Sequence, residues 1–259
     1  MKTAIKLVLM CFLAQLLGTL IASPISLLIA YIQSGTVDQE LTLSYAMPLG
    51  MWLQFFLMAA YLWRRGYLTG DSRLYTPTKI SYLALVLLAG AGLVILEDAL
   101  MHFLQLPDLL HTTFEQLNDS WLGMLCIVVF GPIVEELLFR GAITKVLLRN
   151  YNPSTAILLS ALLFGLIHIN PAQVFGASIV GLLLAWIYWR TGSLIPCMVL
   201  HILNNGLSVW FSNRYPEAEG LVEVCSPALY YPLLAASALL LGVSVWGIYK
   251  IQHPLIENK

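Results

Sequence analysis

Long apolar blocks separated by short polar stretches run along the whole chain. A helix needs about 20 mostly apolar residues to cross the hydrocarbon layer of a membrane, because lipid tolerates no unpaired backbone groups. The pattern therefore predicts eight membrane-spanning helices, near residues 7–32, 43–63, 80–102, 121–148, 154–170, 172–190, 193–212 and 228–249.

Between the third and fourth blocks, residues 104–119 are too polar to span a membrane. Leu106, Leu109, Leu110 and Phe114 recur there at roughly helical spacing, which allows either a short helix on the membrane surface or a solvated loop. The pattern shows no internal repeat and no linker. We therefore expect a single transmembrane domain over residues 1–259, with a motif-bearing core at about 121–212.

Composition agrees with a membrane protein. Hydrophobic residues make up 59% of the chain, charged residues only 10%, and the mean hydropathy is +0.81, whereas soluble domains contain about 25% charged residues. The fold class expected is an all-α, polytopic membrane helix bundle of about eight transmembrane helices in a lipid bilayer. A net charge of -1 and the absence of a Lys/Arg run exclude nucleic acid as a partner.

Basic residues alternate between successive loops, and loops rich in Lys and Arg face the cytoplasm. With the N-terminus inside, the cytoplasmic loops and ends hold Lys2, Lys6, Arg64, Arg65, Arg73, Lys79, Lys145, Arg149, Arg190, Lys250 and Lys259. Arg214 alone falls outside. The pattern predicts a multi-pass integral membrane protein with both termini in the cytoplasm.

The fourth block contains ionisable residues that are costly in lipid and therefore indicate a function. Glu136 and Arg140 are four residues apart, so on a helix they meet as an ion pair. Glu135 is rotated about 100° from Glu136 and can point into another part of the bundle. This makes Glu135 the candidate general base and Glu136 with Arg140 a supporting pair. Pro132 is expected to kink the span just before them.

Two later blocks supply further polar groups. In the fifth block, Phe164 and His168 are four apart, which places an imidazole beside an aromatic side chain. In the seventh block, His201 and Asn205 are also four apart and can aim at one point, while Asn204 is rotated away. Each signal is ambiguous alone, but together they indicate a functional site.

These groups suit the hydrolysis of a peptide bond by an activated water molecule. A carboxylate and an imidazole can deprotonate water, while a second imidazole and an amide can hydrogen-bond the oxyanion. No Ser or Cys stands in a nucleophile pattern, and the chain contains no HExxH motif. Glu135, His168 and His201 could still bind zinc as a His2Glu set, but their spacing is not that of a dedicated zinc motif, so we expect catalysis without a metal or cofactor.

The segment from Gly131 to Gly141 resembles the EExxxR signature of the CAAX protease and bacteriocin-processing family of intramembrane proteases, which includes the CAAX prenyl endopeptidases. Phe164 to His168 resembles its FxxxH motif, and His201 to Asn205 its HxxxN motif. The resemblance implies eight helices, water activation by Glu135 and His168, and an oxyanion hole from His201 and Asn205. It also implies a membrane-associated protein or peptide substrate.

Two other functions remain open from the sequence. Buried Glu, His and Arg also form the proton relays of ion-coupled transporters. Their usual pattern is a pair of Gly/Pro-interrupted spans in corresponding halves of the chain, whereas the polar groups here gather in the fourth, fifth and seventh blocks. The other alternative is a non-catalytic bacteriocin-immunity membrane protein that retains the site residues without using them. An intramembrane endopeptidase is the function that we expect.

Overall fold

The structure, a computed structural model, describes residues 1–69 and 71–251, and over these residues it is helical without a strand. Seven single helices follow predicted blocks: α1 (Lys2–Ser34), α2 (Gln39–Arg64), α3 (Ile80–Leu104), α8 (Pro153–Leu166), α9 (Pro171–Thr191), α10 (Ile195–Arg214) and α12 (Pro227–Ile251). Three short helices lie between them: η1 (Ser72–Tyr75), α4 (His111–Asn118) and α11 (Leu221–Val224).

The fourth block is one continuous helical run made of five pieces. These are α5 (Trp121–Leu125), the π-helical η2 (Cys126–Phe130), α6 (Gly131–Leu138), the π-helical η3 (Phe139–Thr144) and α7 (Lys145–Leu148). The all-helical fold class is confirmed. Within the described chain, six helical segments are long and apolar enough to cross a membrane.

Two predicted spans fall short of that standard for different reasons. The helix α8 has only 14 residues, because it ends at Leu166 and not near residue 170 as the pattern predicts. The helix α10 has 20 residues, but its His and Asn side chains make it more polar than the others. Between α3 and the fourth block, part of residues 104–119 forms the short helix α4, while Leu106, Leu109 and Leu110 lie in the irregular segment before it.

The chain divides into two compact units, which are described separately. The first unit comprises Met1–Gly70 and Leu110–Ile143, and the second comprises Asp71–Leu109 and Thr144–Lys259. Because the units interleave along the sequence, neither is one continuous segment. The expectation of a single domain stays a prediction.

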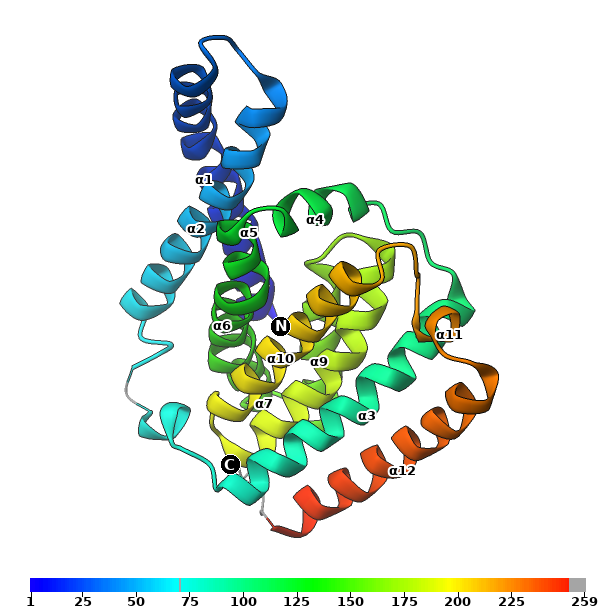
Figure 1. Cartoon of the computed structure of the whole chain (residues 1–259). Helices are drawn as coiled ribbons and strands as arrows, with labels where there is room; N and C mark the ends of the chain where they lie inside the picture. Colours follow the sequence, from blue (N-terminus) through cyan, green and yellow to red (C-terminus); the bar gives the residue numbers. More distant parts are fainter. Residues whose placement is uncertain (70, 252–259) are drawn as a thin grey trace. The chain divides into compact units, whose positions relative to one another are not determined.

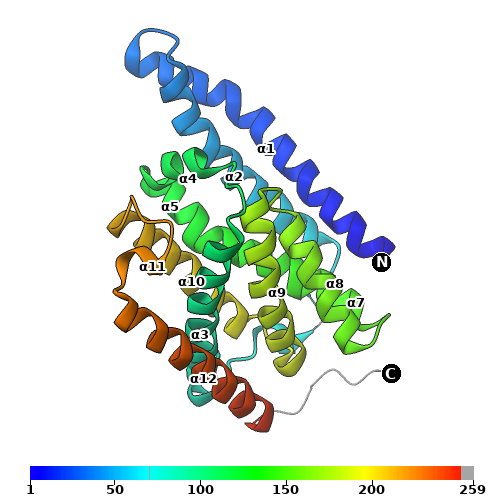
Figure 2. The same cartoon turned by 90° about the vertical axis from the view of Figure 1, so that its right-hand side faces the viewer.

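In the first unit, α1 and α2 lie side by side along much of their length (Figures 1 and 2). Gly18 allows this approach, because a Cβ atom there would lie 2.5 Å from the carbonyl oxygen of Gly50. The fourth block packs against α2, where the Trp52 and Phe130 ring centroids are 4.4 Å apart. These contacts fix the helix that holds the carboxylates.

In the second unit, α3 packs along α12, and α8 packs along α9 (Figure 2). The helix α9 also contacts α3, and α10 contacts both α3 and α9. Gly181 lies where α9 meets α8, so close that a side chain there would press on Ala161 and Phe164. The helix α9 therefore holds both α8, which precedes His168, and α10, which contains His201.

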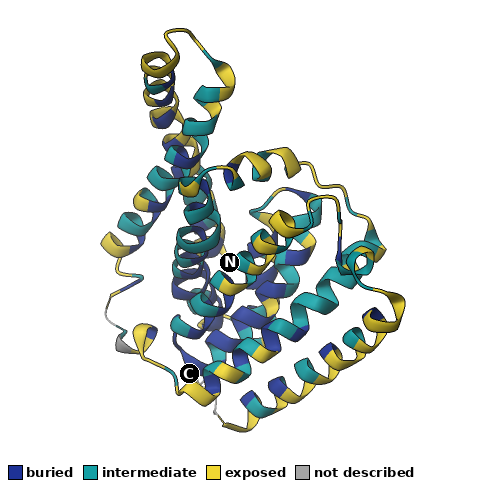
Figure 3. Cartoon of the chain, viewed as in Figure 1, coloured by how far each residue is buried: buried dark blue, intermediate teal, exposed yellow. Residues whose placement is uncertain are grey.

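Exposed residues recur along the helices (Figure 3), and many of them are large and hydrophobic. On α12, for example, Leu239 is 71% exposed, whereas Ser244 and Ile248 are buried. An exposed leucine of this kind suits a helix that faces lipid, because lipid chains are as apolar as the side chain itself. The two serines Ser237 and Ser244 of α12 are buried instead.

Candidate functional site

The carboxylates lie on a helical run whose hydrogen bonding shifts on both sides of them. The helix α6 follows the π-helical η2, where the Gly131 amide donates to the Cys126 carbonyl, five residues earlier. Pro132 follows near the start of α6, and because it has no N–H group it cannot donate the next backbone bond of this continuous run. The π-helical η3 follows at once. Such π segments are rare and occur mostly at functional sites.

Glu136 and Arg140 form the predicted ion pair. Arg140 Nη1 donates to Glu136 Oε1 at 2.9 Å, and both side chains are fully buried. Arg140 lies in η3, so the pairing is made across the junction of α6 with a π-helical turn and not within a regular α-helix. A buried pair of this kind fixes the local geometry, because either charge alone would be costly away from water.

Glu135 has a different environment from its neighbour. Its side chain is half-buried, whereas that of Glu136 is buried. The difference agrees with the rotation of about 100° between adjacent helical residues. Of the two adjacent carboxylates, Glu135 is therefore the one that is not enclosed by the surrounding side chains.

His168 lies in the turn beyond α8, and not within a spanning helix as the sequence predicts. Its Nδ1 is 2.9 Å from the Phe164 carbonyl oxygen. A carbonyl oxygen carries no proton, so Nδ1 must donate. In the neutral ring, Nε2 then has a lone pair, which is the form that a general base needs.

The ring of Phe164 contacts the imidazoles of both His168 and His201. Its ring centroid lies 5.2 Å from that of His168 and 5.6 Å from that of His201, and both contacts are edge-on. Phe164 and His201 are buried, and His168 is half-buried. The FxxxH phenylalanine is thus the wall against which both imidazoles are held.

Asn205 follows His201 by one turn on the continuous helix α10, as predicted. Its Oδ1 accepts a hydrogen bond from Asn204 Nδ2 at 3.3 Å. This contact orients the Asn205 amide, with its oxygen turned towards Asn204. Both asparagines are half-buried.

The backbone directly after His168 is strained. Ile169 has a φ of +62°, a conformation that β-branched residues rarely adopt. The Asn170 amide donates to the His168 carbonyl at 2.6 Å, which closes a γ-turn around Ile169. Strained backbone of this kind persists only where its surroundings hold it, and it gathers at functional sites.

The predicted site residues therefore fall into two groups. Glu135, Glu136 and Arg140 belong to the first unit, and Phe164, His168, His201 and Asn205 belong to the second. The ion pair of Glu136 with Arg140 and the contact of Phe164 with His168 are present as expected from the sequence. The convergence of His201 and Asn205 on one point stays a prediction. Across residues 1–69 and 71–251, no cluster of three or more His, Cys, Asp or Glu side chains has the arrangement of a metal site.

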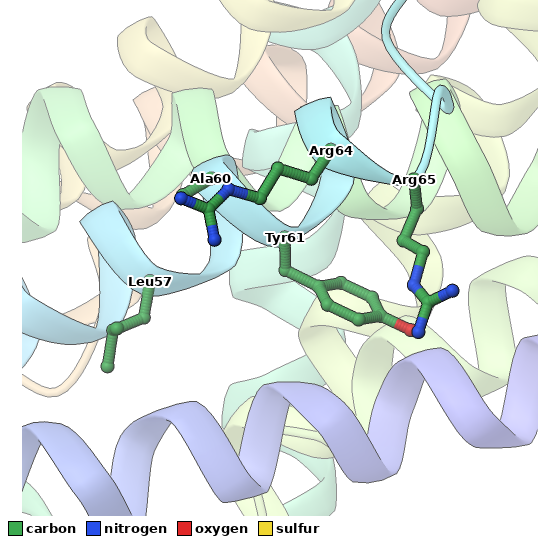
Figure 4. A pocket seen from close by; sticks show the side chains of 5 residues that line it. All are labelled: Leu57, Ala60, Tyr61, Arg64 and Arg65. Atoms are coloured by element: carbon green, nitrogen blue, oxygen red, sulfur yellow. The ribbon is translucent and has the colours of Figure 1, made fainter.

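A groove on α2 lies apart from these residues. Leu57, Ala60, Tyr61, Arg64 and Arg65 line it, and Figure 4 shows the side chains, four of which come from the last turns of α2 and one, Arg65, from the residue after its end. The Arg65 guanidinium lies 5.8 Å from the centre of the Tyr61 ring. None of the predicted site residues lines this groove, so we do not assign it to the candidate site.

Comparison with known proteins supports the resemblance inferred from the motifs. Residues 117–207 match the family model described as type II CAAX prenyl endopeptidase Rce1-like. The matched segment contains all three motifs, from Glu135 to Asn205. No curated protein and no solved structure matches the chain. The match supports a CAAX-type intramembrane endopeptidase, and with the apolar helices a multi-pass integral membrane protein, as the general class.

Proposed function

We propose that this chain, whose residues 117–207 match the Rce1-like endopeptidases, hydrolyses peptide bonds of membrane-associated proteins or peptides by activated water. The observation that carries the proposal is the Phe164 ring, which contacts both His168 and His201. Two imidazoles on one aromatic ring, from the turn after α8 and from α10, with one of them held as the base tautomer, are more than helix packing requires.

In the proposed reaction, Glu135 removes one proton from a water molecule while Nε2 of His168 accepts a hydrogen bond from the other. The water oxygen attacks the carbonyl carbon, and negative charge develops on the carbonyl oxygen. His201 and Asn205 donate hydrogen bonds to this oxyanion. Collapse of the intermediate breaks the C–N bond, and the leaving amine takes the proton from Glu135.

Glu136 and Arg140 have a supporting role in this scheme. Their buried ion pair holds the helix that positions Glu135. A zinc ion bound by Glu135, His168 and His201 is the alternative way to activate the water, and His168 Nε2 suits a metal as well as a proton. We propose the metal-free route, because the ligand spacing is not that of a dedicated zinc motif.

Purified protein in detergent or proteoliposomes would be incubated with a library of peptides, anchored either by a prenyl group or by a transmembrane segment. Mass spectrometry of the products identifies the bond that is cut. Glu135→Ala and His168→Ala are expected to abolish cleavage. Glu115→Ala and His111→Ala change an exposed pair on α4 and are the matched controls.

Full cleavage by Glu135→Ala or His168→Ala would overturn the assignment of these residues. Loss of wild-type activity with a chelator, restored by zinc, would overturn the metal-free route. Ion flux into proteoliposomes that depends on Glu135, without hydrolysis of any peptide, would favour a transporter. A cellular phenotype that survives Glu135→Ala would favour a non-catalytic role.

A further inference from the structure

Asn170 begins α9 but does not cap it. An asparagine at this position normally accepts a hydrogen bond from the amide two or three residues later. Asn152, at the start of α8, does so: its Oδ1 accepts from the Thr155 amide at 2.9 Å. The side chain of Asn170 makes no such bond to α9, although only 1% of the residue is exposed.

Instead, both polar groups of the Asn170 side chain bind the segment that follows α3. Its Nδ2 donates to Asp108 Oδ1 at 2.7 Å, and its Oδ1 accepts from the Leu109 amide at 2.9 Å. A third bond runs beside them, from the Ala172 amide to the Pro107 carbonyl at 3.4 Å. All of these residues belong to the second unit. A bond to a carboxylate is among the stronger hydrogen bonds in proteins.

The same residue ends the strained turn that carries His168. The backbone amide of Asn170 closes the γ-turn at Ile169, while Nδ1 of His168 is bound to Phe164 at the end of α8. His168 is thus held on one side by Phe164 of the preceding helix α8. On the other side it is fixed through Asn170 by a segment about 60 residues earlier in the chain.

We propose that Asn170 is a positioning residue, which uses Asp108 and the Leu109 amide to hold the turn that aims His168 at the reacting water. The proposal rests on the proposed function for its catalytic consequence. Asn170 itself touches no reacting atom. Its loss should therefore lower kcat and leave KM nearly unchanged, because the substrate still binds but the base is displaced.

The test first removes the hydrogen bond between Asn170 and Asp108 and then restores it with a second substitution. Asn170→Asp keeps an acceptor for the Leu109 amide, but it removes the donor to Asp108 and faces it with a second carboxylate. We expect kcat to fall by about 10- to 100-fold with little change in KM. Asp108→Asn alone should have a small effect, because its amide oxygen can still accept from Asn170.

The double variant Asp108→Asn/Asn170→Asp restores a donor facing a carboxylate with the direction reversed. It should recover most of the lost kcat, whereas independent effects would add. Asn152→Asp is the matched control, since aspartate is as good an N-cap as asparagine and activity should be unchanged. If Asn170→Asp does not fold, Asp108→Ala removes the same bond without altering α9, and it should lower kcat in the same way.

Hydrogen–deuterium exchange provides a measurement that does not depend on activity. Asn170→Asp should speed exchange in peptides covering residues 167–172 and 107–110 together, and the double variant should slow both again. If the wild-type protein cleaves no peptide but exchange behaves in this way, the proposed function is wrong, whereas the contact of Asn170 with Asp108 and Leu109 is confirmed. Unchanged kcat in Asn170→Asp, or no recovery in the double variant, would overturn the positioning role.

Discussion

At the scale of single residues, burial determines how much a charged pair contributes. Glu136 and Arg140 are fully buried, whereas His111 and Glu115 have the same four-residue spacing and are more than half exposed. Exposed pairs contribute little because water screens them. A buried pair is costly to break, because the remaining charge stays away from water after its ion pair is lost.

We therefore predict that Glu136→Gln lowers the free energy of unfolding by about 3 kcal/mol or more. Glu115→Gln, the matched exposed control, should change it by less than about 1 kcal/mol. Thermal or denaturant unfolding of both purified variants in the same detergent measures the difference. Equal stability of the two variants would contradict a structural role for the buried pair.

The two adjacent asparagines of α10 should differ in their effect on the reaction. Asn205 is one turn from His201 on α10, while Asn204 donates a hydrogen bond to Oδ1 of Asn205. If Asn205 stabilises the oxyanion, Asn205→Ala should lower kcat by about 100- to 1000-fold with little change in KM. Asn204→Ala should cost much less. Steady-state kinetics on the peptide identified above checks both, and a larger loss for Asn204→Ala would refute the oxyanion assignment.

At the scale of helices, close approach depends on where a glycine lies. Gly18 on α1 faces the backbone of α2, whereas Gly242 on α12 has open space around its missing side chain. Gly18→Ala should destabilise the protein, because α1 and α2 must separate. Gly242→Ala should stabilise it by up to about 1 kcal/mol through helix propensity alone. The free energy of unfolding of both variants, measured in detergent, separates the effect of helix packing from that of helix propensity for the same Gly→Ala change.

An ion pair connects the loop before α3 with the end of the fourth block. Asp71 forms ion pairs with Lys145 at 2.9 Å and with Arg73 at 3.2 Å. Partial burial tends to raise the pKa of Asp71, but hydrogen bonds from Lys145 and Arg73 outweigh it and hold this pKa below its ordinary value of 3.8.

A carboxyl group with a depressed folded pKa contributes stability above its unfolded pKa, and this contribution is lost as the pH falls through the folded pKa. The wild-type protein should therefore lose the contribution of Asp71 as the pH drops below about 4. Asp71→Asn should be less stable than wild type at pH 6, and the difference should shrink on acidification. Melting temperatures over this range test the prediction, with the exposed Asp119→Asn as the control. A pH-independent difference would contradict it.

At the scale of the whole molecule, the distribution of basic residues predicts which loops face the cytoplasm. In a background without Cys11 and Cys225, Thr76→Cys should be cytoplasmic and Thr112→Cys should lie outside. An impermeant maleimide added to intact cells should label Thr112→Cys, and it should label Thr76→Cys only after the membrane is opened. Cys126 and Cys197 are buried and can remain. The reverse labelling would invert the topology. The C-terminal residues 252–259 lie outside the described part of the chain.

The sequence alone determined the helices and the local pairs. Hydropathy blocks depend only on neighbouring residues, so the blocks predict all eight long helical runs. Spacing of four residues likewise predicts the contacts of Glu136 with Arg140 and of Phe164 with His168, because one helical turn brings such residues together. The motifs also predict the family whose model matches residues 117–207.

Only the tertiary structure decided where α8 ends, how His168 is held and what Asn170 binds. The pair Asn170-Pro171 is a typical helix start, and the sequence can predict that much. It cannot predict that the side chain leaves α9 to bind Asp108 and Leu109, because these partners lie about 60 residues away and are brought near by the packing of α3 against α9. The strained φ of Ile169 has the same origin, since local preference opposes it and only the surrounding contacts maintain it.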